Sequence, residues 1–399
     1  MWNRLFAFYA FSIYTSLFLF IGIRLKQRNL RYINYHQRIN NRGMSHSDLQ
    51  SDTIHFLRFP LIVGVVFIHA HLSSDFVNIT ASDYPVFYVV NEFVSNILVR
   101  VSVPLFFFFS GFLFYYKTDF NGITYTRKVK NRIQSLLVPY LIWNIFLLAL
   151  YYFVQKIPDI NALFSGEKER IADFSVVDYL HAFGIGSDFP INYQFWFLRD
   201  LIILVVAAPL IFYFIRSTKG YGILLLGVLW LFEDRLPYNL FLLSSLFFFG
   251  SGAFFSISKT DFTQVFGKIC YPVVLLYPLM AISDLFLMDQ PYTVYLHKAT
   301  VVVGGICLIS VVSIWLKRGM KVNNTLSSAS FFVFAMHEPG LKLIKKLAVL
   351  QLPHSELVLL LIYWGAPVLM ILICIALYKI LNTRFPACTK VVTGNRSGV

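Results

Sequence analysis

The stretch LRFPLIVGVVFIHAH, residues 57–71, decides the class of fold, because its continuous apolar run is flanked by an arginine and two histidines. Continuous runs of this kind predict membrane-spanning helices, whereas outer-membrane strands alternate polar and apolar residues. This run extends over about 56–73, and comparable runs occupy residues 5–23, 94–116, 136–155, 195–215, 221–232, 240–257, 268–288, 299–316, 326–349 and 355–380. We therefore expect an all-α polytopic integral membrane protein with about ten core transmembrane helices, plus one extra N-terminal helix if residues 5–23 also span.

The composition supports this fold class. Hydrophobic residues make up 57% of the 399 residues and charged residues 14%, whereas a soluble domain is about one-quarter charged. Both a soluble enzyme and a disordered chain are therefore excluded. The net charge of +14 is explained by cytoplasmic loops rich in Lys and Arg. Membrane lipids are the expected partners, and nucleic acid is not.

The loops also predict an orientation. Basic loops near 24–42, 117–132 and 317–321 alternate with loops poor in basic residues, such as 74–93. The positive-inside rule then predicts a multi-pass membrane protein with a cytoplasmic C-terminus.

Three regions follow from these runs. Residues 1–43 are interpreted as an N-terminal anchor helix with a basic segment, and a translation start at Met44 is the alternative. Residues 44–385 form the transmembrane domain. Residues 386–399 are predicted to be a polar, frayed cytoplasmic tail. The sequence leaves the oligomeric state open.

Arg58 and His69 are the leading candidates for function, because ionisable residues inside apolar runs are costly. They are eleven positions apart in the sequence, which returns a helix to nearly the same face about 16 Å further along its axis. A cation suits an anionic donor, and a histidine suits proton transfer at neutral pH. The alternative is that Arg58 reaches toward the membrane interface and His69 is a hydrogen-bonded core residue.

Other polar residues in the runs allow further predictions. Arg100 is expected to pair with Glu92 or to line a cavity. Arg199 and Asp200 are adjacent and should each pair elsewhere, because neighbouring residues do not face each other on a helix.

The run at 326–349 contains a proline and three lysines. Pro339 should expose backbone carbonyl groups, because it cannot donate a helical hydrogen bond. Lys342, Lys345 and Lys346 share a helix face and are expected to extend to the membrane interface.

Five segments of the chain, in this order, resemble those of the membrane-bound acyltransferase 3 family. They are the Arg-ten residues-His pattern in 57–71, RVSVPLFFFFSGFL at 100–113, RIQSLLVPYLIW at 132–143, WFLRDL at 196–201 and SFFVFAMHEP at 330–339. The resemblance runs from about residue 54 to residue 378.

The resemblance implies a ten-helix O-acyltransferase of the bacterial cytoplasmic (inner) membrane. Such an enzyme moves an acyl group, often acetyl, from cytoplasmic acyl-CoA to a hydroxyl of a lipid-linked or cell-surface glycan. Acyl-CoA (acetyl-CoA) is then a donor substrate, and no permanently bound cofactor or metal is expected. The rival hypothesis is a glycan or small-molecule exporter that uses the same scaffold without acyl transfer.

The resemblance also implies roles for particular residues. His69 would act as the general base, with a transient acyl-histidine as the alternative, and Arg58 would bind the donor phosphates or stabilise the oxyanion. Arg132 would bind the donor near its entrance. Ser135 stands where many relatives have a second basic residue, and Arg127 could substitute for it.

The remaining candidates are assigned to acceptor binding or to structure. Trp196 could stack on a sugar ring or belong to the interfacial aromatic belt. His337 and Glu338 lie deep in a run, and a hydrogen bond from Glu338 could orient His69. The long outer loop at 156–194 ends in an aromatic and amide-rich stretch that suits either sugar recognition or an interfacial lid.

Overall fold

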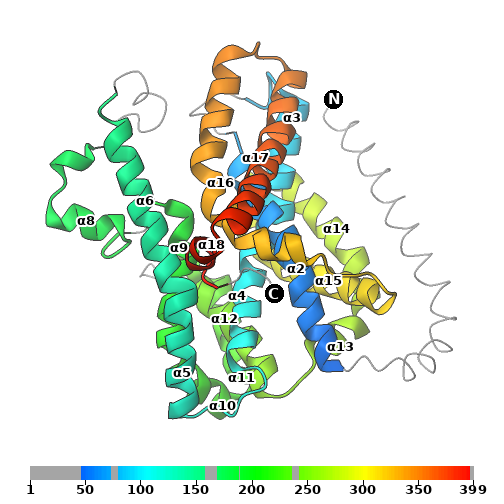
Figure 1. Cartoon of the computed structure of the whole chain (residues 1–399). Helices are drawn as coiled ribbons and strands as arrows, with labels where there is room; N and C mark the ends of the chain where they lie inside the picture. Colours follow the sequence, from blue (N-terminus) through cyan, green and yellow to red (C-terminus); the bar gives the residue numbers. More distant parts are fainter. Residues whose placement is uncertain (1–45, 73–79, 158–168, 188, 236–241, 396–399) are drawn as a thin grey trace.

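The computed structural model describes residues 46–72, 80–157, 169–187, 189–235 and 242–395, and this part of the chain is helical, without strands (Figure 1). The expected anchor in residues 1–43 lies outside it. In chain order the main helices are α2 (His46–Ala70), α3 (Pro85–Glu92), α4 (Ser102–Tyr115), α5 (Gly122–Arg132), α6 (Val138–Val154), α8 (Val176–Ala182), α9 (Trp196–Val206), α10 (Ala208–Thr218), α11 (Gly220–Leu231), α12 (Leu243–Ile257), α13 (Phe262–Lys268), α14 (Cys270–Phe286), α15 (Thr293–Lys317), α16 (Asn324–Gln351), α17 (Glu356–Arg384) and α18 (Pro386–Val392).

Short turns of other helical types extend several of these elements. The π-helix η1 (Phe93–Ile97) and the 3-10 helix η2 (Leu98–Val101) join α3 to α4, and the π-helix η3 (Ile133–Leu137) joins α5 to α6. The 3-10 turn η5 (Tyr193–Phe195) leads directly into α9.

Five helical segments of the described residues are long and apolar enough to span a membrane: Leu49–Ala70, Pro85–Tyr115, Gly122–Val154, Thr293–Lys317 and Glu356–Arg384. Two bent pairs raise the number to seven if each is one span. They are Tyr193–Val206 with Ala208–Thr218, bent by 67°, and Phe262–Lys268 with Cys270–Phe286, bent by 74°. The protein is thus a multi-pass membrane protein with five to seven candidate spans, and the count of about ten stays a prediction.

The difference in count has local causes. The apolar run at 195–215 is interrupted at Ala207, and a new helix begins at Ala208 with Pro209 in its first turn. Helices α11 and α12 have only 12 and 15 residues, fewer than the roughly 20 that cross a bilayer upright. Helix α16 is long enough, with 28 residues, but carries a glutamate and three lysines.

Helix α2 is the element around which the candidate site is built. It packs against α4, α15, α16 and α17. Leu57, Leu61, Val65 and Val66 of α2 are almost fully buried in these contacts. Burial of this apolar surface against four helices fixes the rotation of α2 and therefore the directions of its polar side chains.

Helices α4 and α12 are in direct backbone contact. A Cβ atom at Gly111 would lie 1.9 Å from the carbonyl oxygen of Phe249, and one at Gly252 would lie 1.8 Å from the carbonyl oxygen of Phe108. Only glycine permits this approach on each helix, as in the small-residue interfaces of other membrane helices.

The C-terminal region is ordered, in contrast to the expected frayed tail. Pro386 begins α18, where its missing N–H costs nothing. Trp143 of α6 donates an indole hydrogen bond of 3.0 Å to the carbonyl of Val392, and Thr389 and Thr393 are buried. Residues 386–395 therefore belong to the packed structure.

Candidate active site

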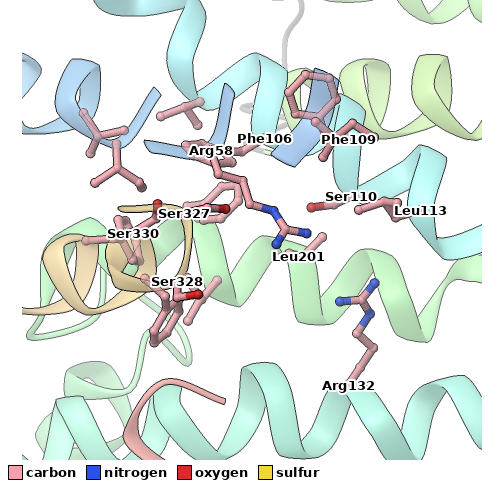
Figure 2. Close-up of a pocket in the computed structure, with 18 residues that line it drawn as sticks. Arg58, Phe106, Phe109, Ser110, Leu113, Arg132, Leu201, Ser327, Ser328 and Ser330 are labelled. Carbon is pink, nitrogen blue, oxygen red and sulfur yellow. The ribbon is translucent and has the colours of Figure 1, made fainter. Parts of the chain in front are cut away.

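A cavity of about 150 Å³ lies between α2, α4, α9 and α16 and contains two arginine side chains. Arg58 reaches it from α2 and Arg132 from the end of α5, and Figure 2 shows both guanidinium groups directed into the same space. We call it the arginine pocket. Its lining is Ile54, Arg58, Ile62, Val65, Val103, Phe106, Phe109, Ser110, Leu113, Arg132, Phe197, Leu198, Leu201, Ser327, Ser328, Ser330, Phe331 and Phe334.

The arginine pocket has the electrostatic character of an anion site. Its polar lining consists of two guanidinium groups and four serine hydroxyls, with no carboxylate. Within the described part of the chain, no hydrogen bond or ion pair engages either guanidinium group. Arginine binds phosphate and carboxylate groups through paired hydrogen bonds, so the two cations are available to an anionic ligand.

The same face of α2 leads from this pocket to His69. Ile54, Arg58, Ile62 and Val65 all line the pocket, and His69 follows Val65 by one helical turn. The spacing of three to four residues places all five on one stripe.

His69 lies in a second group of polar residues, which we call the histidine cluster: His69, Tyr193, Gln194, His337 and Glu338. The His69 Nδ1 atom and the Tyr193 hydroxyl are 2.7 Å apart. The rings of His69 and His337 have centroids 5.3 Å apart. The Tyr193 side chain also hydrogen-bonds to Glu338. Tyr193 thus interacts with both His69 and Glu338, and the bond between Glu338 and His69 stays a prediction.

Pro339 creates the binding surface for Gln194. Because Pro339 has no N–H, the carbonyl of Ala335 lacks its helical donor. The Gln194 amide nitrogen donates to this carbonyl at 3.2 Å and to the carbonyl of Phe334 at 3.0 Å. The prediction that Pro339 exposes carbonyl groups is confirmed, and it explains why the chain before α9 is attached to the middle of α16.

Lys345 has a different position from the one expected. Its side chain is buried, with 4% exposed, and its ammonium donates to the carbonyls of His69 at 2.5 Å and His71 at 3.0 Å. The prediction that it extends to the interface is wrong, because the carbonyls at the end of α2 have no helical donors and bind it instead.

Arg100 lies outside the arginine pocket. It donates to Asn96, whose amide donates to Glu92 at 2.6 Å, and Glu92 also pairs with His71 at 2.8 Å. Arg100 is thus connected to Glu92 through Asn96, as part of a hydrogen-bonded chain along α3, η1 and η2.

Arg199 and Asp200 pair with each other, contrary to the prediction. The Arg199 guanidinium lies 3.1 Å from Asp200 Oδ1, and Ser245 donates to Asp200 Oδ2 at 2.8 Å. Arg199 also donates to the carbonyl of Ser187 at 3.0 Å. Its long side chain folds back onto the neighbouring carboxylate, which the spacing rule for helix faces does not consider. The group connects α9 to α12 and to the preceding loop.

Two other candidates lie away from both groups. Trp196 is partly buried against Phe107, with ring centroids 6.1 Å apart, and belongs to an apolar cluster with α4, α9 and α12. Arg127 is exposed on α5 and does not line the arginine pocket.

Comparison with known proteins agrees with this geometry. A family model described as an acyltransferase domain matches residues 52–379, which include both the arginine pocket and the histidine cluster. The succinoglycan biosynthesis protein ExoH of Rhizobium meliloti (strain 1021) is 24% identical over 364 residues, which cover 87% of this chain and 93% of the relative. No solved structure matches. The chain therefore belongs to the membrane-bound acyltransferase 3 family and is an O-acyltransferase.

Proposed function

We propose that this protein transfers an acyl group from acyl-CoA, held by Arg58 and Arg132, to a hydroxyl of a glycan, with His69 as the general base. The observation that carries the proposal is the arginine pocket: two cations from separate helices enter one carboxylate-free cavity on the same stripe of α2 as His69. The phosphate groups of CoA are the ligand chemistry that fits these cations.

The distance between the two groups favours this assignment of Arg58 over a role in stabilising the oxyanion. His69 follows Arg58 by eleven helical positions, about 16 Å along α2. In CoA the extended pantetheine arm likewise separates the phosphates from the thioester. A phosphate site and a base at different depths of one helix therefore suit a single bound acyl-CoA.

The glycan acceptor is proposed from the relative, which is named for succinoglycan biosynthesis. The orientation is proposed from the basic loops: acyl-CoA reaches the arginine pocket from the cytoplasmic side of the inner membrane, where the C-terminus also lies. The acceptor then approaches His69 from the outer side, along the loop that ends at Tyr193.

The hydrogen bonds of the histidine cluster support the proposed role of His69 as the base. If the Tyr193 hydroxyl donates to the Glu338 carboxylate, its oxygen accepts the proton on His69 Nδ1. This arrangement leaves Nε2 as the unprotonated base. Nε2 takes the proton of the acceptor hydroxyl while the hydroxyl oxygen attacks the thioester carbonyl. The carbon–sulfur bond then breaks, and the imidazolium returns the proton to the thiolate of CoA.

The test is thioester turnover by the purified protein, measured as free thiol released from acetyl-CoA in the presence of glycan fragments. We expect turnover in the wild type and in Arg127→Ala, which alters an exposed arginine of the same helix as Arg132. We expect its loss in both His69→Ala and Arg58→Ala. Normal acylation of the cell-surface glycan in cells that carry only His69→Ala would overturn the proposal.

A further inference from the structure

Two buried side chains beside His69 have hydrogen-bond acceptors without partners. Gln194 is 2% exposed and His337 is 0% exposed. Within the described residues, Gln194 Oε1 and His337 Nε2 have no hydrogen-bond partner. Buried polar atoms are rarely left unpaired, because each costs the free energy of removing it from water.

The orientation of both groups is fixed by their donors. Gln194 Nε2 binds two carbonyl oxygens of α16, so its amide cannot be reversed without placing oxygen against oxygen. His337 Nδ1 lies 2.9 Å from the carbonyl of Phe334 and 3.1 Å from that of Val333. Carbonyl oxygens only accept, so Nδ1 carries the proton, and Nε2 of the neutral ring is an acceptor.

The two acceptors also lie close to each other and to the base. Gln194 and His337 share the carbonyl of Phe334, so their side chains are neighbours. The His337 ring is 5.3 Å from that of His69, and Tyr193, which binds His69, precedes Gln194 in the chain. The two acceptors therefore call for hydrogen-bond donors close to His69, the proposed base.

We propose that Gln194 Oε1 and His337 Nε2 form a subsite that accepts hydrogen bonds from a hydroxyl next to the one acylated, and so selects the position of transfer on the sugar. This inference rests on the proposed function. A polyol matches two fixed acceptors, because each of its hydroxyls can donate once.

The test compares His337→Asn with His337→Gln. The Asn amide nitrogen can replace Nδ1 and keep the bond to Phe334, but Asn has no atom at the position of Nε2, whereas Gln places a polar atom near it. His354→Asn is the control, since it makes the same change in an exposed loop. The probes are methyl glucoside, methyl galactoside and each of their mono-deoxy analogues, with acetyl-CoA as donor, and the readout is acetyl transfer by mass spectrometry.

We expect the wild type and His354→Asn to transfer about three- to tenfold less to one deoxy analogue than to its parent glycoside, as the loss of one hydrogen bond predicts. His337→Asn should transfer acetyl groups equally to this deoxy analogue and to its parent glycoside. His337→Gln should retain part of the preference for the parent. Because each value is a ratio within one variant, the folded fraction cancels.

Two results would contradict the inference in distinguishable ways. In the first, the wild type transfers equally to the parent glycosides and to all deoxy analogues, or the preference is unchanged in His337→Asn. Either outcome would mean that the two acceptors bind water only, and would overturn the subsite alone. Thiol release without transfer to any glycoside would count against the glycan acceptor, and so against the proposed function itself.

Discussion

The arginine pocket and the histidine cluster lie on one face of the same helix, yet they are built in opposite ways. In the pocket, Arg58 and Arg132 face a cavity with no hydrogen-bond partner among the described residues. In the cluster, His69 is bound to Tyr193, which in turn is bound to Glu338. Unpaired charge suits the binding of a ligand that supplies the opposite charge, and a connected network suits a group that must keep one orientation. The difference predicts that substitutions in the two regions change different kinetic constants.

The largest effect is expected in the histidine cluster. His69→Ala should lower kcat for acyl transfer by about 10²–10⁴-fold, because general base catalysis contributes that much, while binding of acetyl-CoA persists. Single-turnover kinetics and equilibrium binding of acetyl-CoA, measured on the same preparation, separate the two. His71→Ala is the matched control, since His71 pairs with Glu92 outside the cluster. Loss of acetyl-CoA binding in His69→Ala would contradict the distinction between a cluster that determines kcat and a pocket that binds the donor.

Substitutions in the arginine pocket should mainly change KM for acetyl-CoA. Arg58→Ala and Arg132→Ala should each raise KM for acetyl-CoA by about 10- to 100-fold, the cost of a charge-assisted hydrogen bond, with a smaller change in kcat. Steady-state kinetics with varied acetyl-CoA measures both constants. Arg127→Ala should stay within twofold of the wild type. If the two pocket variants lowered kcat alone, the pocket would not be the donor site.

A smaller effect is expected where the network orients the base. Tyr193→Phe removes the hydroxyl bound to His69 and Glu338 but keeps the ring. We expect kcat to fall about tenfold, since one positioning hydrogen bond is lost, and KM for acetyl-CoA to remain unchanged. An equal rise of KM in this variant would show that the cluster also contacts the donor.

The smallest of the four effects concerns the end of α2. Lys345→Met removes the ammonium that binds the carbonyls of His69 and His71, and kcat should fall about three- to tenfold as the helix end loosens. Lys345→Arg should restore most of the activity, because it keeps a donor for both carbonyls. Lys342→Met, on the exposed side of the same helix, is the control. Failure of Lys345→Arg to recover activity would argue against this positioning role.

Much of this arrangement follows from the sequence near α2 and Pro339. The helical repeat of 3.6 residues places Arg58 and His69 on one stripe, and the structure confirms that the residues between them on that stripe line the pocket. The missing N–H of Pro339 frees the carbonyl of Ala335 whatever the fold, and this is one of the two carbonyls that Gln194 binds. Both predictions succeeded because they depend on local backbone geometry alone.

The rest of the site depends on contacts between distant parts of the chain. Tyr193 meets His69 across 124 residues and Lys345 meets it across 276, and no local pattern in the sequence specifies these pairs. The aromatic and amide-rich stretch before residue 196 did indicate a special loop, but it could not reveal that the loop contacts His69. The pair of Arg199 and Asp200 was missed for the opposite reason, because the rule for helix faces neglects how far an arginine side chain can bend.

The glycine contacts between α4 and α12 determine which wall of the arginine pocket can move. Because Gly111 and Gly252 leave no gap between the two backbones, neither helix can slide or rotate without carrying the other. Phe106, Phe109 and Ser110 of α4 line one side of the pocket, so that side has the stiffness of two helices rather than one. If a molecule as large as acyl-CoA enters this pocket as proposed, the walls left to move include those of α2, α9 and α16, and α2 is the helix that carries His69. Where α2 is the wall that moves, admission of the proposed donor also repositions the proposed base.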